Sequence, residues 1–199
     1  MIEFSIIIAS RNLAISPFFK AISDWPEDKN SELIIIDSAF SQKTAERLKE
    51  IEKVKRIIYA PPLREPFASV PRFSFRRDFN RALNSALVAA EGKYIIRIDD
   101  YILLKGDFFD IARADVKEYG NRLIIGQKSH ENENEEPWID YFSLRGFHSG
   151  ERFVDIDSVD FTWSFGIASL DVLLKINGWD ERYDLGYAGE DKDILARYI

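Results

Sequence analysis

Short apolar runs alternate with longer amphipathic segments along the first hundred residues. Isoleucine-rich runs of five or six residues predict buried strands, and they occupy residues 4–9, 32–36, 56–60 and 94–98. Apolar side chains at helical spacing predict helices over residues 41–54 and 76–90, and Ser16 followed by proline predicts the start of an earlier helix. Strands that alternate with helices predict an α/β fold with a mostly parallel central sheet flanked by helices.

The second half of the chain continues this pattern less regularly. Helices are predicted over residues 106–119 and 170–176 and from Glu190 onward, and strands over residues 122–127 and 159–165. Residues 128–150 are polar and irregular, which predicts a long loop of the kind that is often functional. Because no repeat, linker or low-complexity segment divides the chain, we expect one domain over residues 1–199.

The amino-acid composition narrows the classes of protein to consider. With 46% hydrophobic and 31% charged residues the chain is globular, and no apolar run approaches the length of about 18 residues that a membrane span needs. The absence of cysteine removes disulfides and thiolate chemistry. Since a strand is predicted directly after Met1, we expect no signal peptide and a cytoplasmic protein.

The charge of the chain is unevenly distributed. A net charge of −7 argues against a nucleic-acid partner, because nucleic-acid binding needs a basic face. Between Lys53 and Arg97, however, basic residues outnumber acidic ones. A basic segment within an acidic chain suits a small polyanion such as a nucleoside diphosphate, although a solvated helix face has the same pattern.

Two adjacent carboxylates, Asp99 and Asp100, follow directly after the strand predicted over residues 94–98. Ligands of α/β sheets bind at the carboxyl ends of the strands, and Mg²⁺ and Mn²⁺ prefer oxygen ligands, often carboxylates together with substrate phosphates. This stretch therefore predicts a site for a divalent metal and a diphosphate. On this stretch alone, two acids that begin a loop or cap a helix explain the pattern equally well.

A second acidic cluster, GYAGEDKD, lies near the end of the chain and is followed by apolar residues. The apolar spacing places Glu190, Asp191 and Asp193 in the first turn of a helix. Acids in a first turn complement the helix dipole, which is sufficient to explain them structurally. The functional alternative is that one carboxylate serves as a general base for a hydroxyl group.

Four segments in this order resemble the family 2 glycosyltransferases of the GT-A fold. They read SIIIASRN from Ser5, ELIIID from Glu32, ALNSALVAAEGKYIIRIDD from Ala82 and LLKINGWDERYDLGYAGEDKDILAR from Leu173. The last segment is also similar to β-1,4-galactosyltransferases, and the resemblance is weakest over residues 128–161. It implies that residues 1–100 bind a nucleotide sugar, with a UDP-sugar as the expected donor, and that residues 101–199 bind the acceptor, a glycan, protein or lipid.

The resemblance also implies roles for individual residues. Asp191 matches the catalytic base and Glu190 its partner at the acceptor hydroxyl, while Asp100 and Asp99 match ligands of a divalent cofactor, Mn²⁺ or Mg²⁺. Asp37 would read the nucleotide base. The residues implied to bind the donor are Ser10, Arg11, Asn12, Asp37, Arg81, Asn84 and Asp99. Those implied to line the sugar and acceptor site are Tyr187, Trp163 and Gly189, although core packing would also explain the two aromatic residues.

The implied reaction is an inverting, metal-assisted transfer of a sugar, but the sequence departs from the family at three places. Tyr101 stands where a third acid is usual, and Leu83 stands where the family has arginine. The chain also ends eight residues after Asp191. It is therefore either a minimal version, of a kind that a viral or archaeal genome encodes (in host cytoplasm if viral), or part of a longer protein.

Two other functions remain open from the sequence. One is a catalytically inactive module that binds a nucleotide sugar or a glycan, which the substitution at Tyr101 and the short C-terminus favour. The other is a sugar nucleotidyltransferase, which has a related architecture. The absence of glycine from ASRNLAIS, where a nucleotidyltransferase would need a glycine-rich phosphate loop, argues against this third function.

Overall fold

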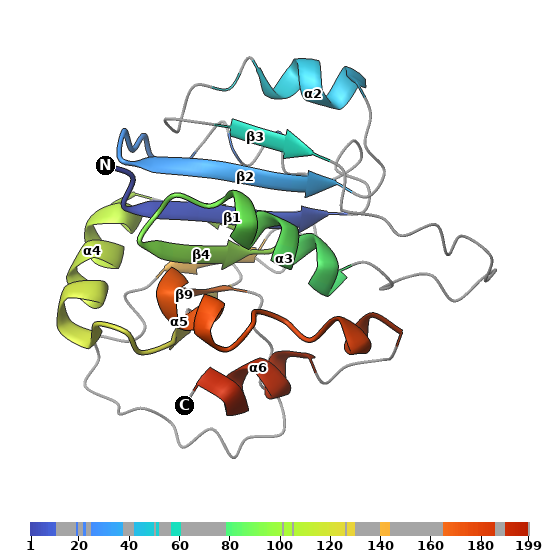
Figure 1. Cartoon of the computed structure of the whole chain (residues 1–199). Coiled ribbons are helices and arrows are strands. Elements are labelled where there is room, and N and C mark those ends of the chain that lie inside the picture. Colours follow the sequence, from blue (N-terminus) through green and yellow to red (C-terminus); the bar gives the residue numbers. More distant parts are fainter. Residues whose placement is uncertain are drawn as a thin grey trace.

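A six-stranded sheet forms the centre of the computed structural model (Figure 1). The residues described are 1–10, 19, 22, 25–37, 42–49, 51, 57–60, 79–100, 102–104, 106–125, 127–129, 140–143, 165–185 and 190–198. The strands are, in spatial order, β3 (Ile57–Ala60), β2 (Ser31–Asp37), β1 (Phe4–Ser10), β4 (Tyr94–Ile98), β9 (Phe165–Ser169) and β6 (Ile124–Ile125).

The first four strands of the sheet are parallel, as the alternation of strands and helices predicts. Their arrowheads point the same way in Figure 1. Ser10 at the end of β1 pairs in register with Asp37 at the end of β2, and β4 lies on the other side of β1. β9 is antiparallel to both β4 and β6. The carboxyl ends of β1, β2 and β4 therefore meet at one edge of the sheet.

Helices cover both faces of this sheet. Side chains alternate along the strands, so that Ile6 and Ile8 face one apolar core and Ile7 faces the other. The first core contains residues of α2 (Gln42–Leu48) and α4 (Phe108–Tyr119). The second contains residues of α3 (Phe79–Ala89), α5 (Leu170–Lys175) and α6 (Glu190–Tyr198). The predicted α/β fold, a mostly parallel central sheet flanked by helices, is confirmed.

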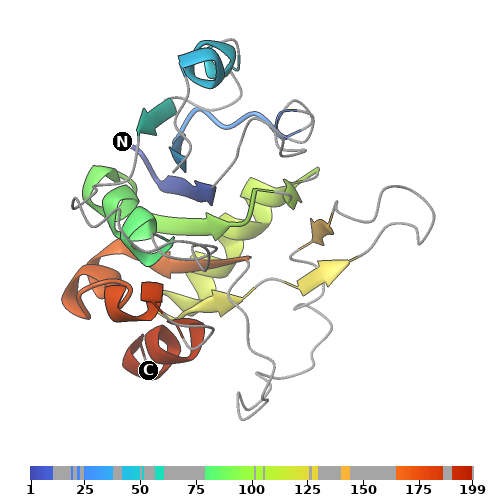
Figure 2. The same ribbon diagram turned by 90° about the vertical axis from the view of Figure 1, so that its right-hand side faces the viewer.

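The prediction of a long loop over residues 128–150 is wrong in part. Residues 127–129 and 140–143 form strands β7 (Gln127–Ser129) and β8 (Asp140–Ser143), which join β5 (Ile102–Leu104) in a small second sheet of order β5-β8-β7. Figure 2 shows β7 and β8 apart from the main sheet. The strand predicted over residues 122–127 is accordingly divided between β6 and β7, because its two ends pair with different sheets.

The strand predicted over residues 159–165 lies outside the described part of the chain except for Phe165. That residue begins β9 (Phe165–Ser169), whose other residues were not predicted as a strand. Its sequence, FGIAS, contains small residues with little intrinsic preference for a strand, but pairing with β4 on one side and β6 on the other provides its hydrogen bonds. Most of the helix predicted to begin at Ser16 also lies outside the described residues, but Phe19 and Ile22 are helical, and both pack in the first apolar core.

α3, α4, α5 and α6 agree with the predicted positions, whereas α2 ends at Leu48, and Ile51, inside the predicted range 41–54, is not helical. α5 shows why its end was predictable. Asn177 and Gly178 both adopt positive φ angles directly after α5, and the Gly178 N–H donates to the carbonyl of Leu173 at 2.8 Å. This left-handed geometry is the usual way in which glycine ends a helix. In the described part of the chain, no helix is both long and apolar enough to cross a membrane.

Candidate functional site

Polar side chains converge where β1, β2 and β4 end. The Ser10 hydroxyl donates a 2.5 Å hydrogen bond to the Asp100 carboxylate, which joins the end of β1 to the residues that follow β4. Asp37, the register partner of Ser10, is only 1% exposed. The sequence predicted Ser10, Asp37, Asp99 and Asp100 as separate donor or metal residues, and the parallel register of the strands brings them to one edge.

Asp100 lies in a strongly negative environment. Burial raises the pKa of its carboxyl, and the neighbouring charges of Asp99 and Asp37 raise it further, while the hydrogen bond from Ser10 acts in the opposite direction. Carboxylates that are crowded in this way lose mutual repulsion when a cation is bound between them. Among the described residues, no three histidine, aspartate or glutamate side chains are grouped closely enough to hold a metal ion.

The Asp99–Asp100 pair nevertheless fits the chemistry of a divalent cation. Magnesium is usually bound by one or two carboxylates, and the other positions are taken by water and substrate phosphates. Both carboxylates carry hard oxygen atoms at the end of a buried strand, and Asp99 keeps 20% of its side-chain surface accessible. These two residues are therefore those that could hold a metal ion together with a bound diphosphate.

The third feature of the site is a buried arginine in β4. Arg97 is 4% exposed, and its Nη2 lies 3.6 Å from Asp99 Oδ1 while its Nη1 lies 3.5 Å from Asp191 Oδ1. The Phe79 ring at the start of α3 lies 5.1 Å from the guanidinium carbon, measured to the ring centroid. One cation thus links the carboxylate after β4 to a carboxylate of the last helix.

Asp191 is in the first turn of α6, where the sequence predicts it. Ile194, one turn later, is fully buried in the core beside α3, which fixes the face that α6 turns toward the sheet. Asp191 consequently approaches the carboxyl edge of β4, and its side chain is 17% exposed. Glu190 begins α6, but its side chain lies outside the described part of the chain. The other predicted site residues beyond this part are Arg11, Asn12, Trp163, Tyr187 and Gly189.

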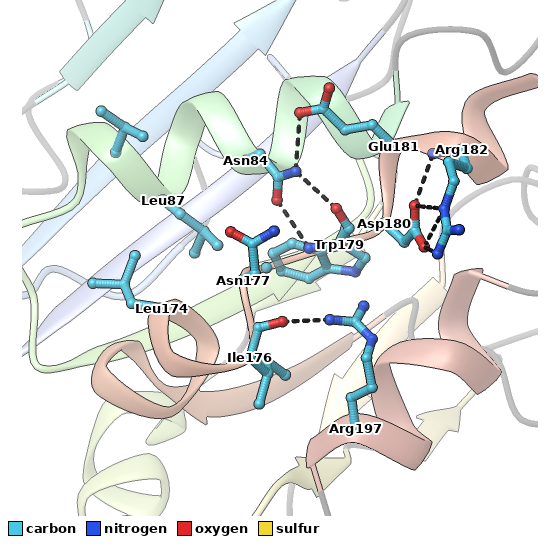
Figure 3. A pocket seen from close by; sticks show the side chains of 12 residues that line it. Asn84, Leu87, Leu174, Ile176, Asn177, Trp179, Asp180, Glu181, Arg182 and Arg197 are labelled. Carbon is cyan, nitrogen blue, oxygen red and sulfur yellow. Dashed lines mark hydrogen bonds and ion pairs between the residues drawn. The ribbon is translucent and has the colours of Figure 1, made fainter.

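Arg81 and Asn84 contact the segment before α6. Asn84 donates to the carbonyl of Trp179 at 2.8 Å and to Glu181 at 3.1 Å, and it accepts from the Trp179 N–H at 2.9 Å (Figure 3). Arg81 Nε pairs with Glu181 at 3.3 Å. These contacts tie α3 to the 3₁₀ helix η4 (Glu181–Leu185). The donor-binding role predicted for both residues stays a prediction.

Beside these contacts lies a cavity of about 690 Å³ between α3, α5, η4 and α6 (Figure 3). Val88 and Leu174 contribute exposed apolar surface at its rim, 82% and 53% exposed, and Arg182 and Arg197 contribute positive charge. None of the clustered carboxylates at the carboxyl edge lines it. The cavity therefore lies apart from the carboxylate cluster at the carboxyl edge of the sheet.

A carboxylate far away in the sequence caps the first turn of α3. Asp184 of η4 accepts hydrogen bonds from the backbone N–H groups of Asn80 at 2.7 Å and of Arg81 at 3.1 Å. These are N–H groups of the first helical turn, which have no partner within a helix. The first turn of α3, with Phe79 beside Arg97, is therefore held by a residue more than a hundred positions later.

A model of a known family matches most of the chain. The model of the family described as "Glycosyl transferase family 2" matches residues 5–175. The chain belongs to glycosyl transferase family 2. The curated protein sequences include no match to it.

Solved structures show the same fold as this family 2 chain. A crystal structure of residues 1–349 of S. aureus TarS has a TM-score of 0.67 at 15% identity, covering 99% of this chain and 55% of that one. The same TarS fragment in complex with UDP-GlcNAc gives 0.66 at 14% identity, covering 99% and 53%. The mannosyltransferase PcManGT from Pyrobaculum calidifontis, in complex with GDP-Man and Mn²⁺, gives 0.57 at 14% identity, covering 98% and 50%. The predicted GT-A fold is confirmed, and the chain spans about half the length of these proteins.

Sequence reasoning missed two residues of this family 2 site. In the sequence analysis Arg97 is only one of the bases of a basic segment. Its place in the middle of the apolar run YIIRI nevertheless indicates a functional or structural contact, because a buried charge needs a partner. Asp184 had no such signal. Its partners are backbone N–H groups, which every residue except proline carries, so that nothing in the sequence marks the contact.

Proposed function

We propose that this chain is a metal-dependent inverting glycosyltransferase, which moves a hexose from a UDP-sugar to an acceptor hydroxyl. The observation that carries the proposal is the meeting of Asp99 and Asp100 with Asp191 at one edge of the sheet, where Arg97 contacts both Asp99 and Asp191. This reaction needs a group that binds the donor phosphates and a group that removes a proton, and we assign the first role to Asp99 and Asp100 and the second to Asp191.

The donor end of the site consists of residues on β1, β2 and β4. Asp99 and Asp100 would hold a divalent cation, which would offset negative charge on the departing nucleoside diphosphate. Ser10 orients the Asp100 carboxylate through its hydrogen bond. Asp37 would accept a hydrogen bond from the ring N–H of the base. Uridine is proposed because uracil has such an N–H and because TarS, a protein of this fold, was solved with UDP-GlcNAc.

The acceptor end belongs to the second half of the chain, with Asp191 as the general base. Its carboxylate would take the proton of the acceptor hydroxyl while the hydroxyl oxygen attacks the anomeric carbon and the bond to the diphosphate breaks. Attack from the face opposite the leaving group inverts the anomeric configuration. Glu190 is proposed to orient the acceptor hydroxyl, and Tyr187 and Trp163 to line the sugar site. The acceptor is a glycan, protein or lipid hydroxyl.

Calorimetric titration with UDP, with and without Mn²⁺, tests the donor site. The wild type should bind UDP only with the metal present, and Asp100→Asn should weaken that binding about 10–100-fold, as expected for loss of a charged contact. Asp110→Asn removes an exposed carboxylate of α4 and is the matched control, with affinity unchanged. Equal binding of UDP by the wild type and Asp100→Asn would contradict the assignment of the metal site.

Hydrolysis of UDP-glucose or UDP-N-acetylglucosamine tests the base, because transfer to water requires no identified acceptor. Asp191→Asn should retain the affinity for UDP and lower kcat about 10²–10⁴-fold, the usual contribution of a general base. A wild type that binds UDP with Mn²⁺ but neither transfers nor hydrolyses any UDP-hexose would instead be a nucleotide-sugar-binding module without catalysis.

A further inference from the structure

Arg97 is a charged residue buried in a strand of the central sheet. It lies in β4 between apolar residues, with Ile7 of β1 and Gly166 of β9 as its register partners, and only 5% of its side chain is exposed. Burying a guanidinium at this position is unfavourable unless carboxylates compensate for the lost hydration. Asp99 and Asp191 provide that compensation from two elements that are far apart in the sequence.

We propose that Arg97 is a positioning residue, which holds the Asp191 carboxylate at a fixed place beside Asp99 and so aligns the general base with the donor. This inference rests on the proposed function, and it adds to that function a residue that touches neither substrate nor reacting atoms. The α6 helix begins just before Asp191, so that its first turn is held to the sheet at this point by the arginine contact.

The geometry of the guanidinium suits this task. Different nitrogen atoms reach the two carboxylates, Nη2 toward Asp99 and Nη1 toward Asp191. Such a planar fork fixes the separation and direction of two anions, whereas a lysine ammonium is a single point charge on a flexible stem. The Phe79 ring at 5.1 Å restricts the guanidinium further from the α3 side.

The contacts also connect the two ends of the site. Arg97 and the divalent cation assigned to Asp99 would compete for that carboxylate, so that a bound cation would weaken the hold of Asp99 on the guanidinium. The guanidinium would then interact more strongly with Asp191, because its positive charge would be shared between fewer carboxylates. Binding of the donor would thereby tighten the position of the base before transfer.

Replacement of Arg97 by methionine tests the proposal through a separation of binding from turnover. Arg97→Met should lower kcat for UDP-hexose hydrolysis about 10–100-fold, the effect of a misplaced catalytic group. The affinity for UDP with Mn²⁺ should stay equal or increase, because Asp99 loses a competing cation. A loss of UDP affinity that parallels the loss of kcat, or an unchanged kcat, would overturn the proposal.

Arg113→Met is the matched control. Arg113 also joins carboxylates of separate elements, with Nε 2.7 Å from Glu3 and Nη2 2.8 Å from Asp28, and it contacts Asp110 of its own helix at 3.6 Å. Glu3 and Asp28 precede β1 and β2 at the opposite end of the strands. This variant should lower the unfolding midpoint and leave kcat and UDP affinity unchanged. Arg97→Lys, which retains the charge without the fork, should recover only part of the kcat lost in Arg97→Met, and full recovery would overturn the argument from geometry.

A double-mutant cycle of Arg97→Met and Asp191→Asn, followed by urea unfolding, gives a result that does not depend on activity. The losses in unfolding midpoint should be less than additive, because both variants break the same contact. Strict additivity would show that the contact does not hold Asp191 and would overturn the inference. Failure of the wild type to bind UDP would instead refute the proposed function, and the cycle would still decide whether Arg97 positions Asp191.

Discussion

Replacement of Asp184 by alanine should destabilise the protein more than its position in a short surface helix suggests. Asp184 is 5% exposed and accepts hydrogen bonds from two backbone N–H groups of α3. The Asp184→Ala variant removes both acceptors at once. Asn80 is 2% exposed, so that water has little access to its N–H group once the carboxylate is removed.

The expected magnitude follows from these two bonds. A hydrogen bond to a charged group contributes about 1.5–3 kcal/mol, and loss of a helix N-cap costs about 0.5–2 kcal/mol. Because relaxation recovers part of the two bonds, we expect a loss of about 3 kcal/mol in the free energy of unfolding. For a chain of this length, this corresponds to a decrease in Tm of about 6–12 °C.

Urea and thermal unfolding followed by circular dichroism measure this loss, and hydrogen exchange locates it. The amides of Asn80 and Arg81 should exchange faster in Asp184→Ala, since the first turn of α3 opens more readily. Asp184→Asn keeps one acceptor oxygen and should lose about half as much stability. Asp171→Ala removes an exposed carboxylate of α5 as the control. If Asp184→Ala unfolds within about 0.5 kcal/mol of the wild type, the cap contributes little and the reasoning is refuted.

Three further predictions concern other parts of the molecule. Gly92→Ala places a methyl group 2.5 Å from the Ser5 backbone nitrogen and should lower the free energy of unfolding by about 1–3 kcal/mol in urea titrations. The raised pKa of Asp100 means that it takes up a proton at a higher pH than an ordinary carboxyl, so that calorimetry should show Mn²⁺-dependent UDP affinity falling as the pH is lowered through that pKa. Hydrogen bonds from Arg182 lower the pKa of Asp180 to about 2, and NMR titration of Arg182→Ala should return it toward its ordinary value of 3.8.

Asp180 and Asp100 change the stability of the fold with pH in opposite directions. The ionised form of Asp180 is favoured by folding, so that its contribution is present above pH 3.8 and is lost as the pH falls through about 2. The ionised form of Asp100 is disfavoured by folding, and its effect is to reduce stability as the pH rises from 3.8 through its raised pKa. A UDP affinity that is independent of pH down to 3.8, or an Asp180 midpoint that Arg182→Ala leaves in place, would contradict these assignments.

The fold was largely predictable because its main signals are local. Runs such as ELIII carry enough isoleucine to predict a strand that is buried on both faces, and alternation with helices predicts a parallel sheet. β9 was missed beyond Phe165 because Gly166 and Ala168 have little strand preference and their conformation depends on β4. β7 and β8 were missed because each pairs within a small sheet whose third strand, β5, lies elsewhere in the sequence.

The candidate site was predictable only as a set of separate residues. Asp99 and Asp100 could be found because they end a strand, and Asp191 because it begins a helix. Their proximity could not be derived from spacing, since it depends on how α6 packs against the sheet through Ile194. The resemblance to a known family supplied the expectation that the two clusters act together, and the position of Arg97 supplies a physical connection between them.

The late position of β9 in the sequence affects how the sheet forms during translation. β1 to β4 are complete when Ile98 has been synthesised, but β9, the second neighbour of β4, begins 67 positions later at Phe165. At a translation rate of about 5–20 residues per second, β9 is synthesised roughly 3–13 s after β4. During that time the unpaired backbone N–H and C=O groups along the edge of β4 are open to pairing with strands of other chains. The nascent chain is therefore exposed to aggregation between these two points of synthesis, and variants that weaken β9 should reduce the yield of folded protein more than its activity once folded.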